Sequence, residues 1–119
     1  MANILIVEDN AAISRVIQLA LEENGHIVQF CKSGNEAIDL LSKQTPDLVI
    51  TDIQLPGKSG KDIIEKMRSE NRLSNVPAII MTAHTPDNKT FPEESLYQGL
   101  IVKPFELEQL KLTVNHCIT

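Results

Sequence analysis

At 119 residues the chain has room for one domain, since most domains run to about 100–150 residues, and we expect residues 1–119 to form it. Its 42% hydrophobic and 23% charged residues are typical of a globular protein, and its net charge of −5 argues against direct nucleic-acid binding. No apolar run approaches the about 20 residues that span a membrane, and the N-terminal residues do not resemble a signal peptide. We therefore expect a cytoplasmic protein without membrane contact, in which Cys31 and Cys117 are reduced structural thiols.

Short apolar runs alternate with amphipathic stretches along the whole chain. The first run, residues 4–7, is continuous and rich in β-branched side chains, which is typical of a strand buried on both faces. Four similar runs follow. The strands are thus expected at residues 4–7, 27–30, 48–50, 76–81 and 100–102.

Four helices are predicted by apolar residues at helical spacing. The first begins after a cap at Asp9 or Asn10 and ends at Gly25, and the second begins at Ser33. The others are expected around residues 60–67 and 107–118. Prolines interrupt residues 83–98, where we expect an irregular connection with a short helix that begins at Pro92.

Buried strands that alternate with helices indicate an α/β fold, a doubly wound parallel sheet with helices on both faces. In such sheets ligands bind beyond the carboxyl ends of the strands. The residues at these ends are Glu8 and Asp9, Asp52, Thr82 and Lys103. Three carboxylates, a hydroxyl and an amine should therefore converge at one edge of the sheet.

Carboxylates that share a site repel one another, by about 4 kcal/mol for two charges 4 Å apart at an effective dielectric constant of 20. Either some of them are protonated or a cation lies among them, and Mg²⁺ prefers oxygen ligands of this kind. A lysine and a threonine beside such a cation outline a phosphoryl-transfer site. Asp52 would then be the nucleophile, since aspartate can form an acyl phosphate.

These residues resemble the receiver domain of bacterial response regulators, the family of chemotaxis-type phospho-acceptors. The resemblance covers essentially the whole chain. It rests on four segments in order: residues 4–10, residues 47–57 with Gly60, residues 81–83 and residues 103–105. The resemblance implies a flavodoxin-like sheet of five parallel strands in the order 2-1-3-4-5.

The resemblance also implies a role for each site residue. Asp52 matches the phospho-acceptor, and Glu8 and Asp9 match the acidic pair that holds Mg²⁺ together with it. Gln54 matches the position whose backbone carbonyl also binds the metal.

Two further positions match the residues that contact the phosphoryl group. Thr82 corresponds to the switch hydroxyl, and Lys103 corresponds to the lysine that pairs with the phosphoryl oxygens. The Lys103–Pro104 peptide bond matches one that is usually cis in the family.

The function implied is transfer of a phosphoryl group to Asp52 from a sensor histidine kinase or a histidine phosphotransfer protein, followed by slow hydrolysis. Such a domain is a signalling switch for a downstream protein, not a conventional enzyme. The identity of that protein, the presence of a homodimer, and whether the chain is a stand-alone receiver or a piece of a longer regulator or hybrid kinase stay open.

The chain departs from the family pattern in two places. Leu100 stands where an aromatic residue often partners the switch threonine, and Tyr97 is out of register with that position. Residues 83–98 lack the usual alanine-rich helix, which indicates a remodelled output face with a specialised partner. His84, two residues past Thr82, is a candidate for tuning the phosphoryl lifetime near neutral pH.

Two other functions compete with this interpretation. A phosphorylation-independent interaction module on the same fold is compatible with the altered output segment. A hydrolase of the haloacid-dehalogenase type also uses an aspartate and Mg²⁺, but it requires a second aspartate where this chain has Gln54. Nucleotide binding is disfavoured, because no glycine-rich phosphate-binding motif is present.

Overall fold

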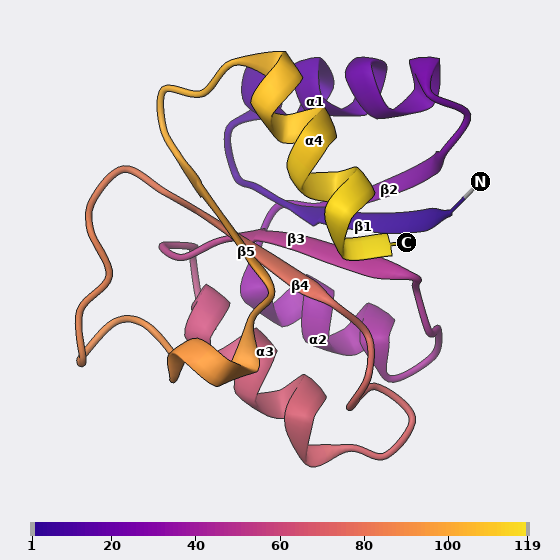
Figure 1. The fold of residues 1–119 in the computed structure, drawn as a ribbon. Coiled ribbons are helices and arrows are strands. Elements are labelled where there is room, and N and C mark those ends of the chain that lie inside the picture. Colours follow the sequence, from indigo (N-terminus) through magenta and orange to yellow (C-terminus); the bar gives the residue numbers. More distant parts are fainter. Residues whose placement is uncertain (1, 119) are drawn as a thin grey trace.

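Five parallel strands form one sheet in the order β2-β1-β3-β4-β5, as the resemblance implied (Figure 1). The computed structural model describes residues 2–118. The strands are β1 (Asn3–Val7), β2 (Ile27–Cys31), β3 (Leu48–Asp52), β4 (Ala78–Thr82) and β5 (Gly99–Val102). Each strand lies within about two residues of the range expected from its apolar run.

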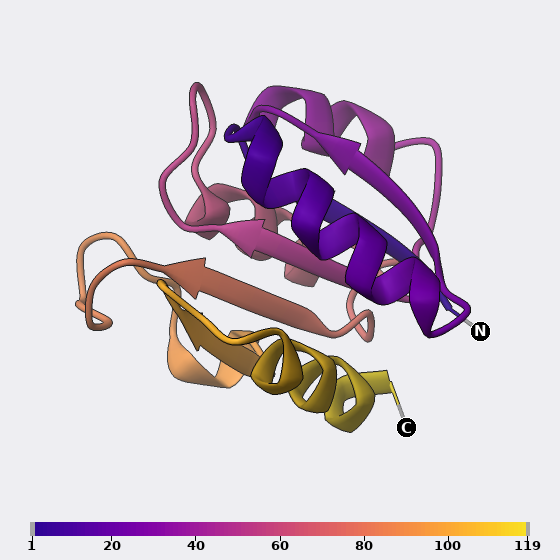
Figure 2. The ribbon, with the colours of Figure 1, turned by 90° about the horizontal axis from the view of Figure 1, so that it is seen from above.

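Helices cover both faces of the sheet (Figure 2). One face carries α1 (Ala11–Glu23) and α4 (Leu107–Ile118), and the other carries α2 (Gly34–Leu41) and α3 (Gly60–Ser69). Successive residues of a strand point to opposite faces, so Ile4 and Ile6 join the core under α1 and α4. Leu5 and Val7 join the core under α2 and α3.

Side-chain caps fix where the helices start. The Asn10 side chain accepts a hydrogen bond from the backbone N–H of Ile13, and Ser33 caps α2 in the same way. Ser59 and Asp62 form a reciprocal capping box at the start of α3. Of the two caps considered for α1, the structure thus selects Asn10.

The connection between β4 and β5 contains a single 3₁₀ turn, η1 (Glu94–Leu96), within residues 2–118. The irregular segment expected from the prolines is confirmed, but the short helix expected from Pro92 is a 3₁₀ turn that begins two residues later. The connection runs out past the carboxyl edge of the sheet before it returns to β5 (Figure 1).

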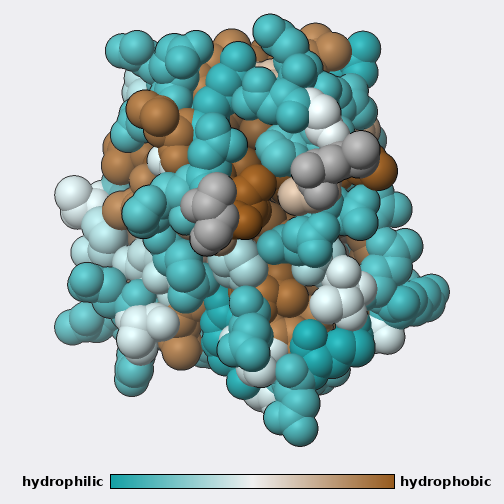
Figure 3. All heavy atoms as spheres, turned by 45° about the vertical axis from the view of Figure 1, so that its right-hand side comes forward, coloured by the Kyte–Doolittle hydropathy of each residue, from teal (hydrophilic) through white to brown (hydrophobic). Residues whose placement is uncertain are grey.

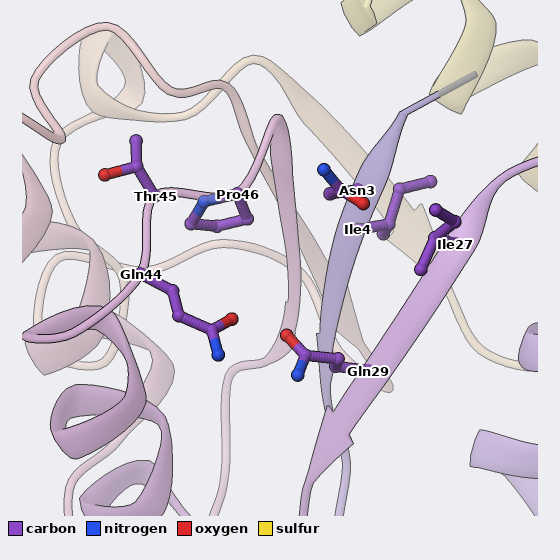
Figure 4. A pocket seen from close by; sticks show the side chains of 7 residues that line it. All are labelled: Asn3, Ile4, Ile27, Gln29, Gln44, Thr45 and Pro46. Atoms are coloured by element: carbon purple, nitrogen blue, oxygen red, sulfur yellow. The ribbon is translucent and has the colours of Figure 1, made fainter.

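The opposite end of the sheet holds a separate cavity of about 310 Å³ (Figure 4). It lies between the starts of β1 and β2 and the α2–β3 connection, and its polar side chains are neutral amides and a hydroxyl, including Asn3, Gln29, Gln44 and Thr45. Since none of the described residues that line it has a titratable side chain, these residues offer none of the acid–base or metal chemistry expected at the carboxyl edge.

The face seen in Figure 3 is mostly hydrophilic, with smaller apolar areas between the polar groups. Among residues 2–118, no helix has the length and apolar character needed to cross a bilayer.

Candidate phospho-acceptor site

The predicted site residues converge at the carboxyl edge of the sheet. Glu8 follows β1 directly, Asp52 is the last residue of β3, and Thr82 is the last residue of β4. Lys103 follows β5. Parallel strands bring these ends together although the residues are far apart in the sequence.

Glu8, Asp9 and Asp52 form an acidic cluster in which one oxygen of each carboxylate lies within 4.8 Å of the others. The cluster ranges from the interior to the surface, because Glu8 is 1% exposed, Asp52 is 9% exposed and Asp9 is open to solvent. Burial strengthens the repulsion between like charges. The cluster therefore needs cations for stability.

Lys103 supplies one cation. Its Nζ atom donates to Oε1 of Glu8 at 2.6 Å and to Oδ2 of Asp52 at 2.8 Å. Burial lowers the pKa of Lys103, but the hydrogen bonds and charges of Asp52 and Glu8 together outweigh this effect and raise its pKa above the ordinary value. The ammonium form of Lys103 is thus firmly held, and this one amine faces three carboxyl groups.

The backbone around Glu8 fixes the orientation of its carboxylate. Oε2 of Glu8 accepts a hydrogen bond from the backbone N–H of Asn10 at 3.0 Å, while Oε1 accepts the Lys103 bond. The N–H of Glu8 itself donates to the carbonyl of Cys31 on β2. Both oxygens of a nearly inaccessible carboxylate are therefore satisfied.

Thr82 is fully buried, and its hydroxyl contacts the backbone of the next loop. Oγ1 donates to the carbonyl oxygen of His84 at 3.0 Å and accepts the N–H of His84 at 3.2 Å. The hydroxyl is therefore near the site, but its proton is engaged away from Asp52.

A cavity of about 450 Å³ opens over the acidic cluster. Asp9, Asp52, Gln54, His84 and Lys103 all contribute to its wall. The structure therefore brings Gln54 and His84 to the same space as the acidic residues, as the sequence predicted. Metal binding by the Gln54 carbonyl and tuning of the phosphoryl lifetime by His84 stay predictions.

The donor set fits a hard divalent cation. Carboxylate oxygens within 4.8 Å of one another can reach a common ion, and Mg²⁺ is typically held by one or two carboxylates with the remaining positions left to water or phosphate. The amine of Lys103 neutralises only part of the cluster. The three acidic residues predicted from the sequence as metal ligands are thus suitably placed for Mg²⁺.

Two residues of α3, Gly60 and Arg68, hold the helix against neighbouring parts of the fold. A Cβ atom on Gly60 would lie 2.3 Å from the backbone oxygen of Asp52, so only glycine lets α3 begin this close to the acceptor strand. Gly60 was part of the family resemblance. Arg68 was missed by the sequence analysis, because an arginine in the last turn of a helix is common.

The guanidinium of Arg68 links α3 to the segment before β5 and to the α3–β4 connection. Its Nε donates to the carbonyl of Leu96 in η1 at 2.9 Å, and Nη2 donates to Oε1 of Gln98 at 3.0 Å. Nη1 reaches three carbonyls of the α3–β4 connection. These acceptors belong to Leu73, Ser74 and Val76.

Comparison with known families identifies the family to which the fold belongs. Residues 4–115 match the family described as the response regulator receiver domain. The chain belongs to this family. A receiver domain is the part of a two-component response regulator that this family describes, so the resemblance seen in the sequence is confirmed at the level of the family.

Two of the curated relatives are regulators of about twice this length. The two-component response regulator PhoP of Pseudomonas aeruginosa is 35% identical over 115 residues, which is 94% of this chain and 49% of that protein. An uncharacterized transcriptional regulatory protein of Bacillus subtilis, YkoG, is 37% identical over 91% of this chain and 47% of its own length. The receiver chain thus spans about half the length of these relatives.

Solved structures agree with the fold. The chemotaxis response regulator CheY4 of Vibrio cholerae has a TM-score of 0.90 at 26% identity, with 98% of both chains covered. The receiver domain of the sensor histidine kinase PA1611 from Pseudomonas aeruginosa has a TM-score of 0.88 at 25% identity, with 98% and 97% covered. That structure has a magnesium ion coordinated in its active-site cleft.

Proposed function

We propose that this receiver accepts a phosphoryl group on Asp52 in a Mg²⁺-dependent reaction and thereby switches a surface that a partner protein reads. The observation that carries the proposal is the position of Lys103, whose ammonium bridges Asp52 and the buried Glu8 beneath an open cavity. A surface lysine or a capping aspartate would not be held in this arrangement.

The proposed transfer step uses the side chains of this site. A carboxylate oxygen of Asp52 attacks the phosphorus of a phosphohistidine on a sensor kinase or a phosphotransfer protein. The phosphorus–nitrogen bond breaks, and its electron pair stays on the imidazole of the donor. The Lys103 ammonium, already 2.8 Å from Asp52, then pairs with a phosphoryl oxygen.

Glu8, Asp9 and Asp52, with the backbone carbonyl of Gln54, would hold Mg²⁺ at this site. When bound, the ion offsets the negative charge on the phosphoryl oxygens. Later attack by water on the phosphorus releases inorganic phosphate and regenerates the Asp52 carboxylate. Because this hydrolysis is slow and ends the signal, we class the protein as a phospho-acceptor and not as a conventional enzyme.

The wider setting is part of the same proposal. In this proposal residues 1–119 are one receiver domain of the kind found in chemotaxis-type phospho-acceptors. It works in the cytoplasm, where ATP provides the phosphoryl group to the sensor kinase. Direct nucleic-acid binding is not proposed, since the net charge is −5. The downstream partner is a protein, and a homodimer is open to test.

Intact mass tests the proposal. The protein is incubated with acetyl phosphate, with and without Mg²⁺, alongside the variant Asp52→Asn. We expect a gain of one phosphoryl group that requires both Mg²⁺ and Asp52. If the protein gains no phosphoryl group and also fails to bind Mg²⁺, the proposal is overturned.

In that event the second candidate, a phosphorylation-independent interaction module, takes its place. The observation in its favour is the β4–β5 connection, in which η1 is one 3₁₀ turn of three residues. Such a segment alters the surface without altering the acidic cluster. Binding of a partner equally well by the protein and by Asp52→Asn would support this candidate.

A further inference from the structure

The hydroxyl of Thr82 can serve only one acceptor at a time. It has a single proton, which it donates to the carbonyl oxygen of His84 at 3.0 Å. To donate to a phosphoryl group on Asp52, Thr82 must release that carbonyl. A partly buried carbonyl that loses its donor costs free energy until the loop moves, so release of the proton favours a new position of His84.

The ring of His84 is packed against the β4–β5 segment. Its centroid lies 5.8 Å from that of Phe91, with the two planes at 76° in an edge-to-face contact. Phe91 is 4% exposed and belongs to the core between the sheet and α3. Movement of His84 therefore acts on a ring that is held firmly by its neighbours.

The Phe91 ring also contacts the ring of Tyr97. The two ring centroids lie 6.4 Å apart, and the planes are inclined by 55°. Tyr97 follows η1 directly and lies at the mouth of two surface cavities, one shared with Phe91 and one shared with Leu100. Tyr97 is thus the point where the ring contacts reach the surface.

We propose that His84 and Phe91 are positioning residues. Through this series of ring contacts they couple the choice of hydrogen-bond acceptor by the Thr82 hydroxyl to the position of the Tyr97 ring. The inference rests on the proposed function, since it needs a phosphoryl group at Asp52. Leu100, at the position where relatives often carry an aromatic partner for the threonine, offers no ring. In this chain the coupling runs through the loop instead.

The protein carries its own reporter for this movement. Tyr97 is the single tyrosine of the sequence, and there is no tryptophan, so tyrosine emission reports on Tyr97 alone. Beryllofluoride, a stable mimic of the phosphoryl group, is added with Mg²⁺. Its ¹⁹F NMR signal shows independently whether it is bound at the site.

Four proteins are compared: the wild type, Phe91→Leu, His84→Ala and the matched control Phe30→Leu. Phe91→Leu keeps an apolar side chain but deletes the ring, and His84→Ala deletes the other ring while leaving its backbone bonds to Thr82 in place. Phe30 is half exposed on the edge strand β2, away from the series of contacts. Circular dichroism shows which variants fold.

Binding of beryllofluoride should change the Tyr97 emission in the wild type and in Phe30→Leu. The change should be mostly lost in Phe91→Leu and in His84→Ala when each protein is compared at the saturation that its own ¹⁹F signal shows, since His84 also lines the site cavity. If Phe91→Leu is unfolded, the change in Tyr97 emission in His84→Ala is the test of the coupling. Bound mimic without a change at Tyr97, or an undiminished change in His84→Ala, would overturn the coupling and leave the proposed function intact. Absence of bound mimic in the wild type would overturn both.

Discussion

The Nζ atom of Lys103 lies 2.8 Å from Oδ2 of Asp52, across 51 residues of sequence. The same ammonium lies 2.6 Å from Oε1 of Glu8, so one cation is shared by two carboxylates that are both nearly inaccessible. Without Mg²⁺ this lysine is the main counter-charge of the cluster. We therefore expect Lys103 to stabilise the resting site, in addition to its proposed pairing with the phosphoryl group.

Replacement of Lys103 by methionine should lower the free energy of unfolding in the absence of Mg²⁺. Breaking a buried ion pair from one side typically costs 3–5 kcal/mol, and because Lys103 keeps some exposure we expect about 2–3 kcal/mol. Urea unfolding measures the loss. Lys43→Met is the matched control, since the Lys43–Asp39 pair is 3.5 Å long and both side chains are about 70% exposed.

The control should lose less than about 0.5 kcal/mol, as exposed pairs do. The pH dependence has a definite sign. Because the pKa of Lys103 is raised in the folded protein, the pair contributes fully below its ordinary value of 10.5 and is lost only as the pH rises through the raised pKa. Equal losses in Lys103→Met and Lys43→Met would contradict the assigned role.

Mg²⁺ should stabilise the folded protein through the acidic cluster. A ligand that binds only the native state at 100 times its Kd adds about 2.7 kcal/mol. Asp9→Asn removes one exposed ligand, so most of this gain should disappear, while without Mg²⁺ the variant should be at least as stable as the wild type because one like charge is gone. Thermal unfolding with and without MgCl₂ measures both effects.

The matched control for the metal experiment is Asp39→Asn, which changes an exposed aspartate outside the cluster. It should keep the full gain from Mg²⁺. Retention of the full gain by Asp9→Asn would show that this carboxylate does not hold the ion.

Gly60→Ala should damage the acceptor strand itself. The new Cβ would lie 2.3 Å from the backbone oxygen of Asp52 and 3.0 Å from Cα of Ile53, and neither backbone atom can move without shifting the site. Overpacking of this kind costs about 1–3 kcal/mol, and the displaced Asp52 should be phosphorylated more slowly by acetyl phosphate. The intact mass of the protein, measured over time, gives the rate of phosphorylation.

Gly25→Ala is the control for backbone substitution. Gly25 has φ of +88°, so alanine is strained there by about 1–2 kcal/mol, but no atom of another residue lies within 4 Å of the new Cβ. Its phosphorylation rate should stay unchanged. An unchanged rate in Gly60→Ala as well would show that the close approach is not needed for the reaction.

Much of the fold follows from local patterns. Strands buried on both faces must be continuous apolar runs, and this is why residues 4–7 and 48–50 could be located within one or two positions. Parallel strands place all their carboxyl ends on one edge, so the convergence of Glu8, Asp52 and Lys103 was predictable without knowing any contact. Roles beyond that convergence came from the family resemblance.

Contacts that depend on the path of a long connection could not be predicted. The strand expected from residue 76 begins at Ala78, because the N–H of Val76 bonds to Leu73 in a turn and its carbonyl accepts from Arg68. The Phe91–Tyr97 contact likewise depends on how the prolines direct the chain. No periodicity in the sequence marks such pairs.

Burial raises the pKa of the Cys31 thiol to about 11, with a smaller contribution from the charge of Glu36. The ordinary value is 9.0, so the unfolded chain releases this proton first as the pH rises. Stability should therefore fall between about pH 9 and pH 11, by up to about 2 kcal/mol from this group. The raised value also agrees with the expectation of an inert structural thiol.

Comparison of the wild type with Cys31→Ala isolates this contribution from other groups that titrate in the same range. Urea unfolding at about pH 8 and about pH 10.5 should show a smaller loss in the variant. Parallel losses in both proteins would mean that the Cys31 thiol ionises as easily in the folded chain as in the unfolded one.

Arg68→Lys should loosen the β4–β5 connection without touching the acidic cluster. Arg68 donates to the carbonyl of Leu96 in η1 and to the side chain of Gln98, which also accepts from the backbone N–H of Ala78. A lysine cannot reproduce a planar fork that reaches several acceptors at once. We expect a loss of about 2 kcal/mol, because several partly buried acceptors are left without donors.

Hydrogen exchange distinguishes this local effect from general destabilisation. Amides of residues 94–98 should exchange faster in Arg68→Lys, while those of β1 and β3 keep their protection apart from the global change. Arg15→Lys is the control, since Arg15 makes one exposed bond to Gln18 on α1. Uniformly faster exchange over the whole sheet would contradict the prediction that Arg68 stabilises the β4–β5 connection alone. Faster exchange restricted to residues 94–98, with phosphorylation of Asp52 preserved, would show that this chain holds its altered output segment separately from its acceptor site.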